Sequence, residues 1–409
     1  MLIDRHILSW ALSDESLRER MSFIAGPRQI GKTTAIQKFL STKAAAGLYY
    51  NWDAYGVKKR FAANPLFFTD DLPAQTPRCW VALDEIHKYP KWKNILKGYY
   101  DEWKNKVQFI VTGSARLEFF KKSGDSLVGR YFSFRMLPLG IREVAGMPHQ
   151  LNEDLILSGN QRLVIPEVKM EITQAVESLL GLTGYPEPFA AGRDRFCARW
   201  RENHISLIIR EDLRDLTKVT QIQKIEVLLY LLPPRVGSPL SLNSLQAPLE
   251  CAYGSVRTWL NYLEAVYLIF SLSPWTTRLS RSVLKEKKYY FWDWGMVEEQ
   301  GQRFENFIAV ALERAVSCWN ENGLGPLKLY YIRTKDGLEV DFAVANKQRV
   351  LFLVETKLQD SSLSQNLVTF KEKTAARLAF QVIKQKNYCA QKANNIYVIG
   401  ADRFLNLLP

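Results

Sequence analysis

The sequence predicts an α/β protein whose N-terminal part is a parallel sheet with flanking helices. Short apolar runs at 21–25, 79–83 and 107–112 have the composition of buried parallel strands, and helical segments follow them. The first run leads into a glycine-rich loop, and the other two end in polar residues. Because the carboxyl ends of parallel strands meet at one edge of a sheet, we expect a functional site at that edge.

The glycine-rich loop fits the phosphate-binding pattern of two glycines separated by four residues, followed by lysine and a hydroxyl residue. The two glycines allow a tight turn whose N–H groups point at phosphate oxygens, and the following helix adds its positive N-terminus. Lys32 is expected to reach the β- and γ-phosphates of a nucleotide, and Thr33 to bind Mg²⁺. The alternative is a chance glycine-rich turn before a helix. The predicted nucleotide-binding residues are Gly26, Pro27, Arg28, Gln29, Ile30, Gly31, Lys32, Thr33 and Thr34.

Two acids follow the second apolar run, as a phosphate-loop ATPase requires near its Mg²⁺. Asp84 is expected to hold the metal, directly or through water, and Glu85 to polarise the attacking water. Taken alone, an apolar run that ends in Asp-Glu is often just a strand with a solvated end. Its place after a phosphate-binding loop favours the ATPase interpretation.

The third apolar run ends at Thr112 and continues into Gly113 and Ser114. A polar side chain beside the acidic strand can sense the γ-phosphate and orient the attacking water. We expect Ser114 in this role and keep Thr112 as the alternative. The alternative is that these residues form a polar turn between a strand and a helix and have no such role.

The length and charge of the chain set broad limits on its organisation. Its 409 residues are too many for one ordinary core, so we expect two or three domains. Lys and Arg number 55 against 42 Asp and Glu, which gives a net charge of +13 that is spread along the sequence. Such an excess suits a polyanionic partner such as DNA, but it suits a merely basic protein equally well.

Cysteine spacing and hydropathy indicate the compartment. The five cysteines lie far apart and form no CxxC pair, which argues against a zinc site or a disulfide framework. The N-terminus lacks the apolar core of a signal peptide, and the longest apolar run, near 266–272, is too short to cross a bilayer. We therefore expect a cytoplasmic protein with no membrane partner.

Five motifs resemble a large family of bacterial and archaeal AAA+ ATPases: GPRQIGKTT, ALDEIHKYPKW, VTGSARL, SLVGRYFSFRMLPLGIREV and GLTGYPEPF, in that order. In that family an ATPase domain precedes a C-terminal region that resembles restriction endonucleases in fold. The resemblance covers nearly the whole chain except the stretch around 147–170. It implies an AAA+ or closely related topology, the use of ATP with Mg²⁺, and a homo-oligomer, for which a ring is one arrangement.

An oligomeric ATPase of this kind usually receives an arginine from the neighbouring subunit, which stabilises the charge that builds on the γ-phosphate. Arg130 lies in a motif that matches the family and is our first choice for this role in trans. Arg116 is the second choice. A surface arginine or a salt bridge is the alternative for both.

The resemblance and the composition together divide the chain into four segments. We expect an AAA+ P-loop ATPase domain at 1–148, a helical lid or linker region at 149–238, a winged-helix-like segment at 239–290, and an α/β restriction-endonuclease-like domain at 291–409. Composition loosens from Met147 to Pro166, which supports the first boundary. Residues 1–20 are expected to form one helix.

Residues 240–273 are typical of a helix-turn-helix, with a short helix, a turn near 251–254 and a second helix. In a winged helix the second helix often binds DNA, and there Arg257 and Asn261 are expected to face outward. Such folds also bind proteins, so DNA contact at these two residues is one of two hypotheses.

A second constellation of polar residues follows a helix that carries Glu305. Asp341 lies on a predicted strand, and Glu355 and Lys357 lie two residues apart on its hairpin partner, where their side chains share a face. This pattern matches restriction-endonuclease-like nucleases. Glu305, Asp341 and Glu355 would hold a divalent cation, and Lys357 would steady the attacking water or the phosphate. Strand-end salt bridges, or a binding domain that has lost its activity, are the alternatives.

The leading functional hypothesis is an ATP-hydrolysing AAA+ motor or switch that acts on DNA, branched or forked DNA included. A second hypothesis is an ATP-dependent regulatory scaffold that binds proteins and cuts nothing. A third is a metal-dependent DNA nuclease gated by ATP.

Overall fold

The computed structural model describes residues 3–42, 46–74, 78–113, 127–157, 163–213, 221–276 and 286–409. The chain packs as two compact units. One comprises Leu2–Leu137 with Ala265–Tyr267, and the other comprises Pro138–Glu264 and Leu268–Pro409. The structural division therefore follows Leu137, whereas the change in composition led us to expect it near residue 148.

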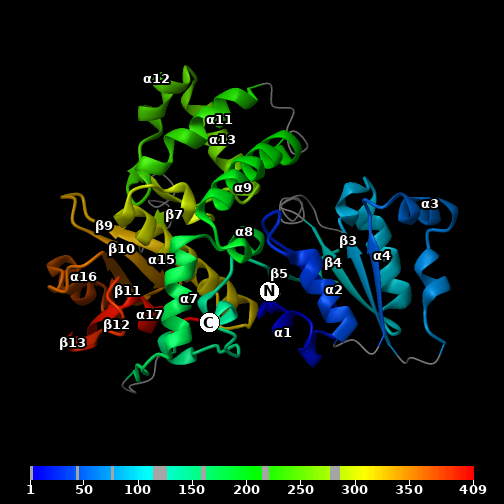
Figure 1. The fold of residues 1–409 in the computed structure, drawn as a ribbon, viewed down its shortest axis with the longest axis horizontal. Helices are drawn as coiled ribbons and strands as arrows, with labels where there is room; N and C mark the ends of the chain where they lie inside the picture. Colours follow the sequence, from blue (N-terminus) through cyan, green and yellow to red (C-terminus); the bar gives the residue numbers. More distant parts are fainter. Residues whose placement is uncertain are drawn as a thin grey trace. The chain divides into compact units, whose positions relative to one another are not determined.

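The N-terminal unit is built on a five-stranded sheet in the order β2-β3-β4-β1-β5 (Figure 1). Every neighbouring pair in this sheet is parallel. The parallel sheet predicted from the apolar runs is therefore confirmed, and β5 is an additional edge strand. The strands are β1 (Met21–Ala25), β2 (Gly47–Asn51), β3 (Cys79–Asp84), β4 (Val107–Thr112) and β5 (Tyr131–Arg135).

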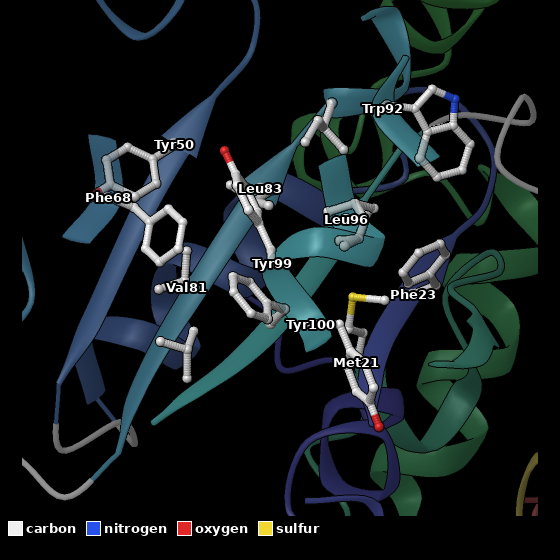
Figure 2. Close-up of a cluster of buried hydrophobic side chains, with 14 of the residues drawn as sticks. Met21, Phe23, Tyr50, Phe68, Val81, Leu83, Trp92, Leu96, Tyr99 and Tyr100 are labelled. Atoms are coloured by element: carbon white, nitrogen blue, oxygen red, sulfur yellow. The ribbon is translucent and has the colours of Figure 1, made fainter. Parts of the chain in front are cut away.

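Helices α2 (Lys32–Thr42), α3 (Tyr55–Ala63) and α4 (Trp92–Trp103) accompany this sheet. On one side, aromatic side chains of α4 pack against β1, β2 and β3, where Tyr99 and Tyr100 are buried with Phe23 and Leu83 (Figure 2). Burying such rings removes large apolar areas from water, which is the main source of stability for this unit. The packed strands hold their carboxyl ends at one edge.

The predicted helix over residues 1–20 is wrong. Among the described residues 3–20, the structure has only α1 (Ile7–Ala11) and a 3-10 turn (Glu15–Leu17). The hydroxyl of Ser22 on β1 donates a hydrogen bond of 2.8 Å to the carbonyl of Ala11. Because this carbonyl is satisfied by the sheet, the helix ends there instead of continuing.

The second unit contains a nine-stranded mixed sheet in the order β13-β14-β12-β11-β10-β9-β7-β8-β6 (Figure 1). Strands β9, β10 and β11 are antiparallel to one another, and β12 runs parallel to β11. The strands are β6 (Pro239–Leu240), β7 (Ile269–Pro274), β8 (Lys287–Phe291), β9 (Lys328–Arg333), β10 (Glu339–Ala345), β11 (Val350–Lys357), β12 (Leu378–Ile383), β13 (Cys389–Ala393) and β14 (Ile396–Gly400).

One sheet joins two segments that the sequence led us to treat separately. Strand β7 pairs in parallel with β9 through Ser273 with Tyr330 and Pro274 with Tyr331. The hairpin of β7 and β8 thereby continues the sheet of the C-terminal strands. Residues 239–290 and 291–409 consequently share one hydrogen-bonded framework.

Helices cover both faces of the C-terminal strands. Trp319 of α15 (Gln300–Glu321) contacts Phe352 of β11, whereas Phe370 of α16 (Gln365–Thr374) packs with the next residue of that strand, Leu353. Neighbouring residues of a strand point to opposite faces, so the two helices lie on opposite sides of the sheet. The C-terminal helix is α17 (Ala401–Leu405).

The middle of the chain is mainly helical, as its periodicity predicts. It contains α6 (Ile141–Val144), α7 (Met170–Gly181), α8 (Pro186–Ala191), α9 (Asp194–Leu207), α11 (Ile222–Leu231), α12 (Gln246–Leu249) and α13 (Tyr253–Ala265). The helices α12 and α13 correspond to the predicted helix-turn-helix. Among the described residues, no helix is both long and apolar enough to span a membrane.

Candidate functional site

The glycine-rich loop joins the carboxyl end of β1 to the first turn of α2. Gly26 has a φ of 153° and Gly31 a φ of 88°, and both values are unfavourable for a residue with a side chain. A Cβ atom at Gly26 would overlap the carbonyl oxygen of Met136, whose N–H bonds to Ala25. The backbone at Met136 thus leaves room only for glycine at the start of the loop.

Lys32 lies inside the curve of this loop. Its Nζ donates hydrogen bonds of 3.0 Å to the carbonyl of Gly26 and 2.7 Å to that of Pro27, and the residue is buried. The ammonium group is therefore held over the main chain of the loop. A phosphate placed in the loop would meet this charge directly.

Asp84 is the centre of a small network at the carboxyl edge of the sheet. Its Oδ2 accepts hydrogen bonds from the hydroxyls of Thr33 (2.7 Å) and Tyr49 (2.6 Å), and its Oδ1 accepts one from Thr112. The donors come from α2, β2 and β4, so the network ties three elements to the end of β3. The structure thus brings together the predicted residues Lys32, Thr33 and Asp84.

Tyr49 is a residue that our sequence analysis missed. Burial raises the pKa of its hydroxyl, and the hydrogen bond to Asp84 raises this pKa further. The hydroxyl therefore stays protonated and remains a donor. The two tyrosines in the run 47–51 favour a strand, but the sequence does not show that this strand pairs with the acidic one.

Glu85 follows the network in a left-handed backbone conformation, with a φ of 59°. Burial raises the pKa of its carboxyl above the usual value, and the nearby charge of Lys88 opposes that rise. Its Oε2 lies 3.4 Å from Nζ of Lys88, which also pairs with Asp53 at 2.6 Å. Glu85 is thus a mostly buried carboxylate beside Asp84, as a general base requires.

Of the predicted arginine and γ-phosphate-sensing residues, the structure describes Arg130 and Thr112. Arg130 forms a two-point ion pair with Asp101, at 2.8 Å from Nε to Oδ1 and 3.1 Å from Nη2 to Oδ2. It precedes β5 and therefore lies at the amino edge of the sheet, opposite the phosphate-binding loop of its own chain. Thr112 belongs to the Asp84 network, while Ser114 and Arg116 lie outside the described residues.

The polar residues of the C-terminal unit form a cluster of ion pairs. Nζ of Lys288 lies 3.8 Å from Glu305 and 3.9 Å from Asp341, and Nζ of Lys357 lies 3.1 Å from Glu355. Burial raises the pKa of Glu305 and of Glu355 to about 7 each, and the charge of Asp341 adds to both rises. The four residues predicted from the sequence are thus neighbours, but Lys288 is a member that the sequence analysis did not include.

This cluster does not fit a divalent cation. Within the part of the chain that the structure describes, no three His, Cys, Asp or Glu side chains are arranged to hold a metal ion. Oxygen ligands of Mg²⁺ or Ca²⁺ must lie within about 2.0–2.6 Å of one point. The expected cation site at Glu305, Asp341 and Glu355 is therefore not supported, because an ammonium group lies among these acids.

The helix α13 presents the two residues predicted to contact DNA. Arg257 and Asn261 are exposed, whereas Val256, Leu260 and Leu263 on the other face are buried. The two polar residues are four positions apart, so they lie on the same face of the helix. Their outward orientation agrees with the prediction, although orientation alone does not identify a ligand.

Three segments of the chain match models of protein families. Residues 18–145 match the model of the AAA domain family. Residues 173–303 and 300–404 match two models described as domains of unknown function, DUF8612 and DUF4143. Each model covers less than half of the chain.

The curated relatives are uncharacterized proteins. Those of Mycobacterium tuberculosis and Mycobacterium bovis are each 23% identical over 359 residues, covering 84% of this chain and 72% of theirs. One from Methanocaldococcus jannaschii is 25% identical over 303 residues, covering 68% of this chain and 61% of its own length.

Two solved structures align with much of the chain at low similarity. The Aeropyrum pernix ORC1 protein in complex with DNA has a TM-score of 0.32 and 13% identity, with 75% of this chain and 90% of that one covered. Cdc6p from Pyrobaculum aerophilum has a TM-score of 0.24 and 13% identity, with 65% and 85% covered. The match of residues 18–145 and the parallel sheet with its glycine loop together identify the N-terminal unit as an AAA-type nucleotide-binding domain.

Proposed function

We propose that the N-terminal unit binds ATP with Mg²⁺ and hydrolyses it to ADP and phosphate. The observation that carries this proposal is the hydrogen bond from Thr33 to Asp84, which joins the phosphate-binding loop to the acidic strand end. Thr33 and Asp84 offer a hydroxyl and a carboxylate at one point, which are the oxygen ligands that Mg²⁺ prefers. The bound ion would neutralise charge on the β- and γ-phosphates.

Three residues of the chain supply the remaining chemistry. Lys32 would exchange its bonds to the carbonyls of Gly26 and Pro27 for bonds to phosphate oxygens, which attract an ammonium group more strongly. Glu85 would accept a proton from the attacking water, since its burial strengthens it as a base. Arg130 would act on a neighbouring subunit after leaving Asp101, which makes the proposed enzyme dependent on homo-oligomer formation.

Substitution of Lys32 tests the ATPase proposal. Lys32→Ala should abolish phosphate release and weaken ATP binding, because the loop then lacks the ammonium group that would neutralise charge on the γ-phosphate. Lys38→Ala is the matched control, since this lysine lies on the same helix and pairs with Asp4 at the surface. Turnover by Lys32→Ala at the rate of the control would contradict the proposal.

We further propose that the exposed face of α13 contacts duplex, forked or branched DNA. Exposed Arg257 and Asn261 and the net charge of +13 support this step. Arg257→Ala should weaken binding to labelled DNA and reduce its dependence on salt, whereas Thr258→Ala on the same helix should change neither. Absence of DNA binding by the unmodified chain would favour the alternative function, an ATP-dependent protein-binding scaffold.

We also propose a restriction-endonuclease-like fold for the C-terminal strands. The order of α15, three antiparallel strands, α16 and a parallel strand agrees with that expectation. Cleavage of DNA is not part of the proposed function, because the carboxylate cluster does not fit a metal ion.

A further inference from the structure

Three carboxylates of the C-terminal unit surround one buried ammonium group. Nζ of Lys288 lies 2.5 Å from Oε1 of Glu339, 3.8 Å from Oε1 of Glu305 and 3.9 Å from Oδ1 of Asp341. The lysine side chain is 0% exposed, whereas those of the three acids are 15–19% exposed. A lysine is almost never buried to this degree unless it is paired. The charge of Lys288 therefore belongs to this cluster.

Strand β8 is fixed against α15, so the position of Lys288 is defined. Buried Asn306 accepts a hydrogen bond of 2.9 Å from the N–H of Phe291 and donates one of 2.7 Å to its carbonyl. The hydroxyl of Tyr290 donates to Oε1 of Glu305 at 2.7 Å. Lys288 and Tyr290 are two residues apart on one strand, so both side chains point to the face that carries Glu305.

The backbone just before the winged-helix-like segment leaves little room beside Glu305. Gly237 has a φ of 78°, and a Cβ atom there would lie only 2.5 Å from Oε2 of Glu305. A site without room for one methyl group on this side does not admit a hydrated cation there. Lys288 comes from the winged-helix-like segment and Gly237 lies just before its first residue, and both occupy space around the same carboxylate.

The remaining acidic groups have partners within the protein. Oδ2 of Asp341 accepts hydrogen bonds from N (2.8 Å) and Oγ1 (2.7 Å) of Thr356, and Glu355 pairs with Lys357. Within the described residues, Oε2 of Glu355 is buried without a hydrogen-bond partner, but one carboxylate oxygen does not make a metal site.

We propose that Lys288 is the resident cation of this carboxylate cluster and that the cluster takes no divalent cation. In this arrangement the cluster joins the winged-helix-like segment to the C-terminal strands and does not cleave phosphodiesters. The inference is independent of the proposed ATPase and DNA-binding functions, since none of its residues belongs to either site.

Binding of Mn²⁺ to the full chain, measured by the loss of the free-ion signal in electron paramagnetic resonance, tests this proposal. Every chain carries Asp84→Asn, which removes the carboxylate ligand proposed for the metal of the ATP site. We expect no binding of millimolar Mn²⁺ by this background and one new site per chain when Lys288→Ala is added. Addition of Asp341→Asn should abolish the new site. Lys287→Ala is the matched control, because its ammonium group bonds to Ser271 instead, and it should create no site.

Two results would overturn the proposal. One is Mn²⁺ binding by the background that Asp341→Asn removes, since this result would mean that the cluster already holds a metal beside Lys288. This comparison needs no substitution of the lysine and decides the question even if Lys288→Ala fails to fold. The other is a Lys288→Ala chain with an unchanged circular-dichroism spectrum that gains no Mn²⁺ site.

Discussion

The hydroxyl of Thr33, on the first turn of α2, donates a hydrogen bond of 2.7 Å to Oδ2 of Asp84 at the end of β3. These residues are 51 positions apart in the sequence. Their contact joins the phosphate-binding loop to the acidic edge of the sheet, and the proposed ATPase depends on it.

Replacement of Thr33 should therefore impair hydrolysis. Thr33→Ala removes both the proposed metal ligand and a donor to Asp84, so we expect kcat to fall by at least about a hundredfold. Thr42→Ala is the matched control, because this exposed threonine lies in the last turn of the same helix, where its hydroxyl donates to the carbonyl of Lys38. Steady-state phosphate release at several Mg²⁺ concentrations measures the effect, and equal rates for the two variants would contradict the assigned role.

Tyr49 should contribute to stability through the same acid. Tyr49→Phe removes the hydroxyl that bonds to Asp84 at 2.6 Å, and loss of a hydrogen bond to a charged group costs about 1.5–3 kcal/mol. Tyr55→Phe should leave the free energy of unfolding unchanged, because Tyr55 is 79% exposed. Urea unfolding of both variants measures the difference, and equal midpoints would show that the Tyr49 bond contributes nothing.

The phosphate-binding loop should not tolerate a side chain at its first residue. Gly26→Ala places a Cβ atom against the carbonyl of Met136 at a φ of 153°, so we expect loss of ATP binding and a destabilisation of roughly 1–3 kcal/mol. Gly56→Ala is the control, because the space around Gly56 on α3 is open and alanine favours a helix by about 0.5–1 kcal/mol. Isothermal titration calorimetry measures the ATP affinity of the two variants. An ATP affinity that Gly26→Ala leaves unchanged would refute the assignment of the loop to phosphate binding.

Asn306 should hold strand β8 to α15. Asn306→Leu leaves the N–H and carbonyl of Phe291 buried without their partner, and each unsatisfied group costs about 1–3 kcal/mol. We expect a lower melting temperature and faster proteolysis of the segment around β8. Asn261→Leu, at an exposed helix position, should change neither quantity. Wild-type stability of Asn306→Leu would mean that this contact is dispensable.

The N-terminal sheet was predictable because its signals are local. Apolar runs, glycines and strand-end acids lie within short windows, and the predicted strands at 79–83 and 107–112 agree closely with β3 and β4. The prediction of one helix over residues 1–20 was wrong because the hydroxyl of Ser22, on a strand beyond this stretch, donates a hydrogen bond to the carbonyl of Ala11.

Contacts between distant segments account for the other differences. Nothing in the run around Lys288 indicates that its partners are Glu305, Glu339 and Asp341, since strand pairing over dozens of residues brings them together. The same is true of Tyr49, whose role depends on the parallel register of β2 and β3. The sequence pattern indicates the chemical groups of both sites, whereas their counter-charges and hydrogen-bond donors come from segments that only the fold brings close.

The measurement that tests the central claim most directly is single-turnover ATP hydrolysis by Glu85→Gln beside the wild-type chain. Glutamine keeps the shape of the side chain but cannot accept the proton of water, so hydrolysis should slow by about 10²–10⁴-fold while ATP binding persists. Glu102→Gln, the same substitution at an exposed position of α4, is the matched control. Hydrolysis by Glu85→Gln at the wild-type rate would contradict the account.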